Sequence, residues 1–407
     1  MPSTPSLQHV RLAVAACFFV SGAVVSSWVP HIPGMQRALG MSPGVLGAVL
    51  LAFALGALVA MAVSGGLSLR FGAARLMRYA TVLYCLMAPL TVLAPHPMAL
   101  AGVLLLLGLG NGAMGVAMNA EAVEVERAYG RGIMSSFHAL YSLGCLVGAA
   151  MGGLTIAAAL PPVWHLVAVG VLAGLLGVWA SFRYLPRRPA AEEKAPPLLV
   201  KPTPYLALLG LGAFCSFVVE GAMADWAALY MHEELGASEA VAASGSAAFS
   251  LMMLVGRLTG DATTRRFSPA GVVRLGGTLA TLGIGLALAI AHPIAAVVGF
   301  GLVGAGLATV VPNFLSAAGR ETRVPTPRAV AAVFSFGFTG YMAGPAIIGG
   351  IAQVTSLPVA MASLMAFSVV ILLQGSILRR PPSLPAPHDA GKIEAAEPTT
   401  QMETRLP

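Results

Sequence analysis

Apolar residues in this chain come in long blocks rather than at the spacing of a half-buried helix. A helix needs about 20 apolar residues to cross a hydrocarbon core of about 30 Å, whereas a barrel strand needs only about 10 residues that alternate in polarity. The pattern therefore predicts an all-α membrane protein with twelve transmembrane helices, at residues 11–33, 42–66, 74–94, 98–118, 135–159, 164–182, 205–230, 238–259, 270–291, 294–318, 329–354 and 357–378.

The charged residues give these spans a direction. Only 10% of the 407 residues are charged, which excludes an ordinary soluble domain. Lys and Arg collect on the cytoplasmic side of spans, and with a cytoplasmic N-terminus 22 of the 23 basic residues fall inside, leaving Arg37 outside. We therefore expect both termini in the cytoplasm. The net charge of +7 then reflects loops beside lipid headgroups and indicates no nucleic-acid partner.

The chain divides into two similar halves. We expect bundles over residues 1–182 and 205–380, a Pro-rich cytoplasmic linker over 183–204, and a disordered cytoplasmic tail over 381–407. An offset of 196 superimposes many residues of one half on the other: His96-Pro97 on His292-Pro293, Arg70 on Arg266, Gly144 on Gly340 and Gly148 on Gly344. Two parallel six-helix repeats are a transporter architecture, in which the substrate binds between the halves.

Four stretches carry a resemblance to a known family. They are "SSWVPHIP" from Ser26, "VAMNAEAVEVERAYGRGIMSSFHALYSLG" from Val116, "EGAMADWAALY" from Glu220 and "GRLTGD" from Gly256. Together with the repeat they resemble the major facilitator superfamily, and within it the YbjJ-like bacterial inner-membrane branch related to fucose permeases. The resemblance implies a monomeric inner-membrane transporter whose first, fourth, seventh and tenth spans line the cavity.

Two departures from the family pattern concern acids. The loop after the second span usually reads G-x-x-x-D-R-x-G, and this chain has Leu69 at the position of the Asp while Gly65, Arg70 and Gly72 remain. Related sequences also tend to carry an Asp where this chain has Gly115. Both substitutions remove an acid that the family uses at its cytoplasmic hinge or in its cavity.

Polar residues within the spans are the candidate substrate ligands. Asn111 lies about 20 Å along the fourth span, and its amide can both donate to and accept from a hydroxyl. The alternative for such a residue is a hydrogen bond between helices. No Arg or Lys is expected at mid-membrane, which favours a neutral solute. The candidate cavity residues are Asn111, Asn119, Asn313, Trp28, His31 and Trp226.

Acids in the seventh span suggest proton coupling. Glu220 lies about 22 Å along this span, where desolvation favours a protonated carboxyl and an acid marks a proton pathway. Asp225 lies nearer the outer rim, and His138 begins the fifth span. A structural alternative for Glu220 is a neutral carboxyl bonded to a neighbouring helix. The candidate gate residues are Arg70, Gly72, Glu121, Arg127, Arg131, Arg257 and Asp261.

Three functions are consistent with these features. The polar groups in both halves agree best with a secondary transporter that moves a small, neutral, sugar-like solute together with protons. A proton-antiport exporter of hydrophobic compounds and a transporter-like receptor or scaffold are the alternatives. The sequence has no dinucleotide fingerprint, metal cluster or Ser/His/Asp constellation, so we expect neither a cofactor nor an enzyme.

Overall fold

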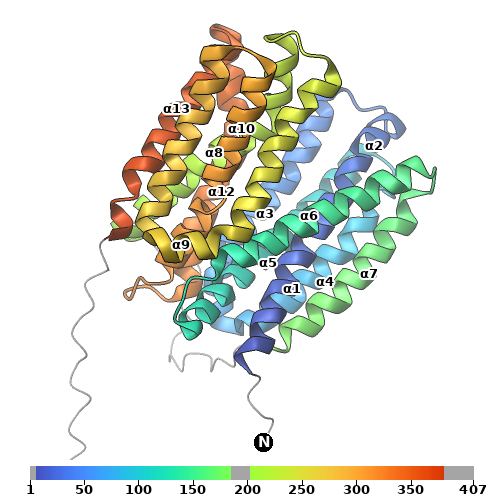
Figure 1. The fold of residues 1–407 in the computed structure, drawn as a ribbon. Helices are drawn as coiled ribbons and strands as arrows, with labels where there is room; N and C mark the ends of the chain where they lie inside the picture. Colours follow the sequence, from blue (N-terminus) through green and yellow to red (C-terminus); the bar gives the residue numbers. More distant parts are fainter. Residues whose placement is uncertain (1–5, 185–201, 380–407) are drawn as a thin grey trace, which may run out of the picture.

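The computed structural model describes residues 6–184 and 202–379, and every regular element within these ranges is a helix (Figure 1). The predicted linker and tail therefore lie mostly outside the described residues. The N-terminal half contains α1 (Leu7–Trp28), η1 (Val29–His31), α2 (Ile32–Ala38), α3 (Pro43–Phe71), α4 (Ala73–Leu90), α5 (Pro97–Tyr129), α6 (Met134–Ala157) and α7 (Pro162–Ser181). The C-terminal half contains α8 (Pro204–Glu233), α9 (Glu239–Ile290), α10 (Pro293–Leu307), α11 (Val310–Ala318), α12 (Thr326–Val354), α13 (Leu357–Gln374) and η2 (Ile377–Arg379).

Twelve membrane crossings follow from these helices. Ten helical segments in the described part of the chain are long and apolar enough to span a membrane. One of them, Val241–Ile290, contains both the eighth and the ninth predicted spans, and the more polar α4 is the third predicted span. The predicted all-α fold with twelve transmembrane helices is confirmed.

Two interruptions have proline as their cause. Within α9, Ser268 leaves the helical region (φ 64°, ψ 157°), because the ring of Pro269 disfavours helical backbone at the residue before it. This kink separates the eighth span from the ninth. The tenth span is divided into α10 and α11 at Ala308 and Thr309. Pro312 cannot donate to the Ala308 carbonyl, and its ring clashes with that group.

The two halves use equivalent residues for equivalent tasks. His96 and His292, which the offset of 196 superimposes, each accept a backbone N–H through Nδ1, from Ala99 at 3.1 Å and from Ile294 at 3.2 Å. Each histidine caps a helix that begins with proline, a residue that suits the first helical position. The repeat therefore extends from the sequence to the way helices begin.

Close helix contacts are repeated as well. In the N-terminal half, a Cβ at Gly144 of α6 would collide with the carbonyl of Phe19 in α1. In the C-terminal half, a Cβ at Gly340 of α12 would collide with the carbonyl of Phe214 in α8. Small residues at these positions let the backbones of two spans approach closely.

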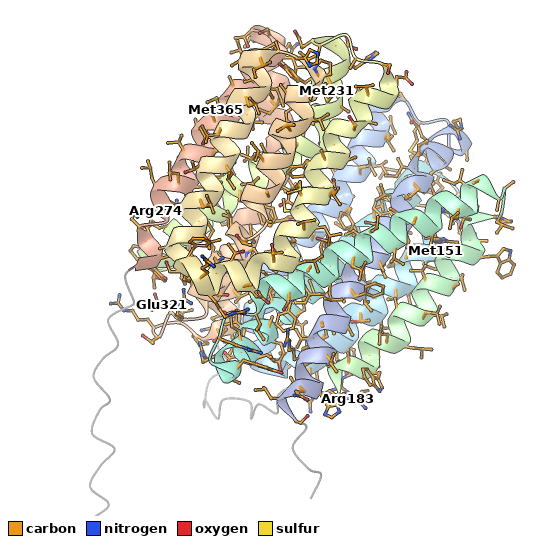
Figure 2. All side chains as sticks on the ribbon, viewed as in Figure 1. Met151, Arg183, Met231, Arg274, Glu321 and Met365 are labelled. Atoms are coloured by element: carbon orange, nitrogen blue, oxygen red, sulfur yellow. The ribbon has the colours of Figure 1, made fainter. Side chains whose placement is uncertain are left out.

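The first and the last described helices begin and end, respectively, at the same end of the bundle, which we call the terminal side. α1 and α8 begin there, while α7 and α13 end there (Figure 1). Figure 2 shows Arg183, Arg274 and Glu321 toward this end, and Met231 at the opposite end. Large apolar side chains such as Leu172 and Leu282 are exposed along the helices, as expected for a surface that faces lipid.

Replacement of Gly144 by valine should destabilise the N-terminal bundle, because the added side chain must displace the backbone of α1. Overpacking of this kind costs about 1–3 kcal/mol. The melting temperature of the purified protein in detergent measures the effect. Gly153→Val is the matched control, since Gly153 lies on the same helix with nothing within 4 Å of its added Cβ. Equal melting temperatures for the two variants would contradict this account of the packing.

Candidate functional site

An ion pair lies inside the C-terminal half, between α8 and α9. The Arg257 guanidinium contacts the Glu220 carboxylate at 3.5 Å, and the side chains of Arg257 and Glu220 are only 11% and 20% exposed. Arg257 lies eleven residues before the kink at Ser268, about 16 Å along the helix. Arg257 is therefore well inside the membrane.

This position corrects two expectations. We expected Arg257 at the cytoplasmic end of the eighth span and no basic partner at the depth of Glu220. Both expectations were wrong, because α9 stays helical as far as Ser268 and so continues beyond the end of the apolar block at residue 259. Because a cation lies beside Glu220, the absence of a cation at mid-membrane no longer favours a neutral solute.

Arg257 also connects the two halves of the protein. Its second terminal nitrogen donates to the Ser142 hydroxyl of α6 at 2.6 Å, and that hydroxyl donates to the backbone carbonyl of His138 at 3.2 Å. We call Glu220, Arg257 and Ser142 the Arg257 bridge. It joins α8 and α9 of one half to α6 of the other.

Other polar groups surround the Arg257 bridge. His138 is 8% exposed, lies one turn before Ser142 and packs against the Phe18 ring. Among the described residues, neither His138 Nε2 nor Arg257 Nε has a hydrogen-bond partner. Tyr341 of α12 lies within electrostatic range of Glu220 and Asp225, and its ring is stacked on Phe338. Of the two groups that accept from Arg257, the Ser142 hydroxyl and the Glu220 carboxylate, only Glu220 is an acid.

Asn111 lies on the face of α5 that points to the other half. Its amide donates to the Tyr84 hydroxyl at 3.1 Å, and this hydroxyl donates to the Ser21 carbonyl at 3.4 Å. One turn later, a Cβ at Gly115 would lie 3.0 Å from the Phe334 ring of α12. Asn111 is partly exposed. Asn111 therefore lies near the contact between α5 and α12 while its amide is held by Tyr84 of its own half.

Asn313 lies at a different depth from Asn111. Asn313 is five residues from the end of α11, about 8 Å, whereas Asn111 is about 27 Å from the terminal-side end of α5. The Asn313 amide donates to the Thr309 carbonyl at 2.8 Å, which satisfies a backbone group near the break in the tenth span. The two asparagines, which we expected to line one cavity, therefore lie at different depths.

The remaining candidate cavity residues are largely covered by their own halves. Trp28 packs against Phe53, and His31 lies against His165. Asn119 is fully buried and donates to the carbonyl one turn earlier. Trp226 is partly buried against Gly349, and Asp225 is exposed.

A cavity of about 330 Å³ lies at the terminal side, between the halves. We call it the terminal-side pocket. α5, the turn before α6, α9 and α11 supply its walls, and Asn313 is among the lining residues. Its charged lining residues are Glu126, Arg127, Arg131, Asp261, Arg265 and Arg320.

Both acids of this pocket bind the beginning of α6. Glu126 accepts from the backbone N–H groups of Ile133 and Met134, each at 2.9 Å. Asp261, which comes from the other half, accepts from the Ser136 N–H at 3.2 Å. Carboxylates are favourable at a helix N-terminus, where N–H groups lack partners. Asp261 therefore links the halves at the terminal side.

Further contacts keep the halves together at this end. Arg127 donates to the carbonyl of Gly319 in the other half. Gly65 of α3 packs directly on the backbone of Pro327 and Arg328 at the start of α12. These contacts close the space between the halves at the terminal side.

Three predicted gate residues lie outside this closure. Arg70 is exposed over the Phe71 ring, and Gly72 uses a positive φ of 88° to turn the chain from α3 into α4. Glu121 is 1% exposed and lies within electrostatic range of Cys17 and Tyr184 inside its own half.

Sequence comparisons give the family. The family model described as Major Facilitator Superfamily matches residues 14–326 and, in a second match, 209–404. An uncharacterized MFS-type transporter of Yersinia pestis is 36% identical over 350 residues, which are 86% of this chain and 91% of the relative.

Solved structures share the fold at low sequence identity. The transporter FucP in its outward conformation has a TM-score of 0.76 at 15% identity, over 91% of this chain and 98% of FucP. FucP is described as the fucose:proton symporter of E. coli. The human organic anion transporter MFSD10 has a TM-score of 0.72 at 18% identity, over 92% of this chain and 100% of MFSD10. From the family match, the relative and the fold together, the chain belongs to the Major Facilitator Superfamily and is a membrane transporter.

Proposed function

We propose that this transporter moves a small hydroxylated solute across the bacterial inner membrane by alternating access, together with a proton. The Arg257 bridge is the observation that carries the proposal, because Arg257 is ion-paired with an acid of its own half and hydrogen-bonded to Ser142 of the other half. One chain contains both halves and the bridge, so a monomer is sufficient for transport.

The charge of Glu220 is the proposed coupling element. Removal of one partner from a buried ion pair is strongly unfavourable, because the other charge is left uncompensated. A proton on Glu220 would therefore weaken the ion pair between Glu220 and Arg257, and the guanidinium could then rearrange. Since Arg257 also binds Ser142 of the other half, this change favours movement between the halves. Proton binding and the rocking of the halves are coupled in this way.

Polar groups and similar folds support a sugar-sized solute. Asn111 offers a partly exposed amide on α5, one turn from the contact of Gly115 with Phe334 of the other half. The similar structures include a fucose:proton symporter and an organic anion transporter, so the fold is compatible with either a neutral or a charged solute. Two alternatives remain: proton-antiport export of hydrophobic compounds, and a scaffold that transports nothing. The uptake experiment below separates them from the proposed function.

The terminal side faces the cytoplasm in this proposal, since Lys and Arg near the span ends gather there. A reporter that is active only in the periplasm should therefore stay inactive when fused after Gln374, at the end of α13. The same reporter should become active when it is inserted in the turn at Gly236, between α8 and the first part of α9. The reverse pattern would refute this orientation.

Replacement of Glu220 by glutamine should abolish the response of transport to a proton gradient. The amide has nearly the same size but cannot release a proton, so the variant should fold and bind solute while losing at least tenfold in gradient-driven accumulation. Uptake into proteoliposomes with an imposed pH difference measures this effect, and counterflow without a gradient measures the remaining exchange.

Glu233→Gln is the matched control, because Glu233 is an exposed acid at the end of the same helix. This variant should accumulate solute as the wild type does. Wild-type accumulation by Glu220→Gln would show that Glu220 is structural. Export driven by the gradient would favour the antiport alternative, and exchange too slow to detect in the wild type would favour a scaffold.

A further inference from the structure

The guanidinium of Arg257 has more hydrogen-bonding capacity than its neighbours use. Arginine carries five N–H donors in a planar fork. One terminal nitrogen contacts Ser142 at 2.6 Å, and the other contacts Glu220 at 3.5 Å, which is a long hydrogen bond. Arg257 is 9% exposed, and its Nε has no partner among the described residues. A buried donor of this kind is unfavourable unless an acceptor reaches it.

The surroundings of Arg257 offer little negative charge. The titratable groups that face it are His138 and Cys145 of α6, Glu220 of α8 and, through Glu220, Tyr341 of α12. The nearest acid on its own helix, Asp261, is one turn away and accepts from the start of α6. Among these groups only Glu220 can neutralise Arg257 directly.

The proposed coupling step removes that single negative charge. When Glu220 takes up a proton, Arg257 is left as a buried cation without a counterion. A neutral solute cannot compensate it, whereas a carboxylate can bind the planar guanidinium through two parallel hydrogen bonds. Protonated Glu220 can then donate to the same ligand. An anion therefore stabilises the protonated site, and a neutral molecule does not.

The charges that line the terminal-side pocket also favour an anion over a neutral molecule. Four arginines line it, at positions 127, 131, 265 and 320, and its two acids are held at the start of α6. Arg257, Asp261 and Arg265 follow one another at intervals of four residues along α9, so they lie on neighbouring turns of one side of the helix. Arg265 thus lines the pocket two turns from Arg257 on the same side of α9, with Asp261 between them.

We infer that the transported solute carries a carboxylate, so that its chemical class is a hydroxylated monocarboxylic acid of about the size of a sugar acid. The inference rests on the proposed function, because the site for the acid arises when Glu220 is protonated during transport. Arg257 binds the carboxylate, with Ser142 and His138 next to it, while the partly exposed Asn111 offers a partner for hydroxyl groups.

The charge balance of transport gives a direct test. A monocarboxylate carries one negative charge and the coupled proton one positive charge, so their joint movement is electroneutral. A neutral sugar that moves with a proton is electrogenic. Wild-type protein in proteoliposomes should therefore take up the acid at a rate that depends on the pH difference and remains unchanged when valinomycin and potassium set the membrane potential.

Matched pairs of acids and neutral analogues serve as probes: D-gluconate with sorbitol, D-glucuronate with D-glucose, and quinate with inositol. Binding to purified protein is followed by the rise in melting temperature, since a ligand that binds only the folded state raises it. At least one acid should bind ten times more tightly than its neutral partner. Arg257→Lys should lose about tenfold or more of that affinity, because lysine retains the charge but lacks the planar fork.

Arg266→Lys is the control, since Arg266 is exposed on the same helix. Its affinity for the acids should equal that of the wild type. Tighter binding of a neutral analogue than of its acid would refute the inference that the solute carries a carboxylate. Uptake of a neutral sugar that responds to the membrane potential would refute it as well. Both results would leave proton coupling intact. An acid that binds through Arg257 but is accumulated without regard to pH would support the carboxylate and overturn the coupling role of Glu220.

Discussion

A charge inside the hydrocarbon region is tolerated only when a partner or water compensates it, and this constraint shapes the centre of the protein. Arg257 meets it with Glu220 from its own half and Ser142 from the other half. The requirement brings α6 and α9 together at mid-membrane. We propose that a proton on Glu220 weakens its contact with Arg257 and thereby changes the hydrogen bond from Arg257 to Ser142 that joins the halves.

At the terminal side, two positions that the repeat relates make different kinds of contact between the halves. The offset of 196 superimposes Asp261 on Gly65. Asp261 binds the first turn of α6 through its carboxylate, whereas Gly65 allows α3 to pack directly on the first turn of α12. The family's usual acid in the α3–α4 region is replaced by Leu69, and close packing at Gly65 provides the contact between the halves there. At these two related positions, one contact between the halves is therefore electrostatic and the other is steric.

The sequence was sufficient for the fold and for part of the site. Long apolar blocks predicted the twelve crossings, and the repeated His-Pro pair marked equivalent helix starts. The depth of Arg257 was not predictable from hydropathy, because the polar residues that follow it suggested a loop while the helix continues to the Pro269 kink. The separation of Asn111 and Asn313 was also missed, since it depends on how far α5 and α11 extend beyond the apolar blocks.

The distance between the halves at the terminal side tests the central claim most directly. Spin labels at Arg75 of α4 and Arg266 of α9, both exposed, would report it by pulsed electron paramagnetic resonance after replacement of the four native cysteines. We predict one short distance for wild-type labels at neutral pH, and a second, longer population at acidic pH and in Glu220→Gln at any pH. The same single short distance in all three conditions would contradict the claim that the charge of Glu220 holds the halves closed.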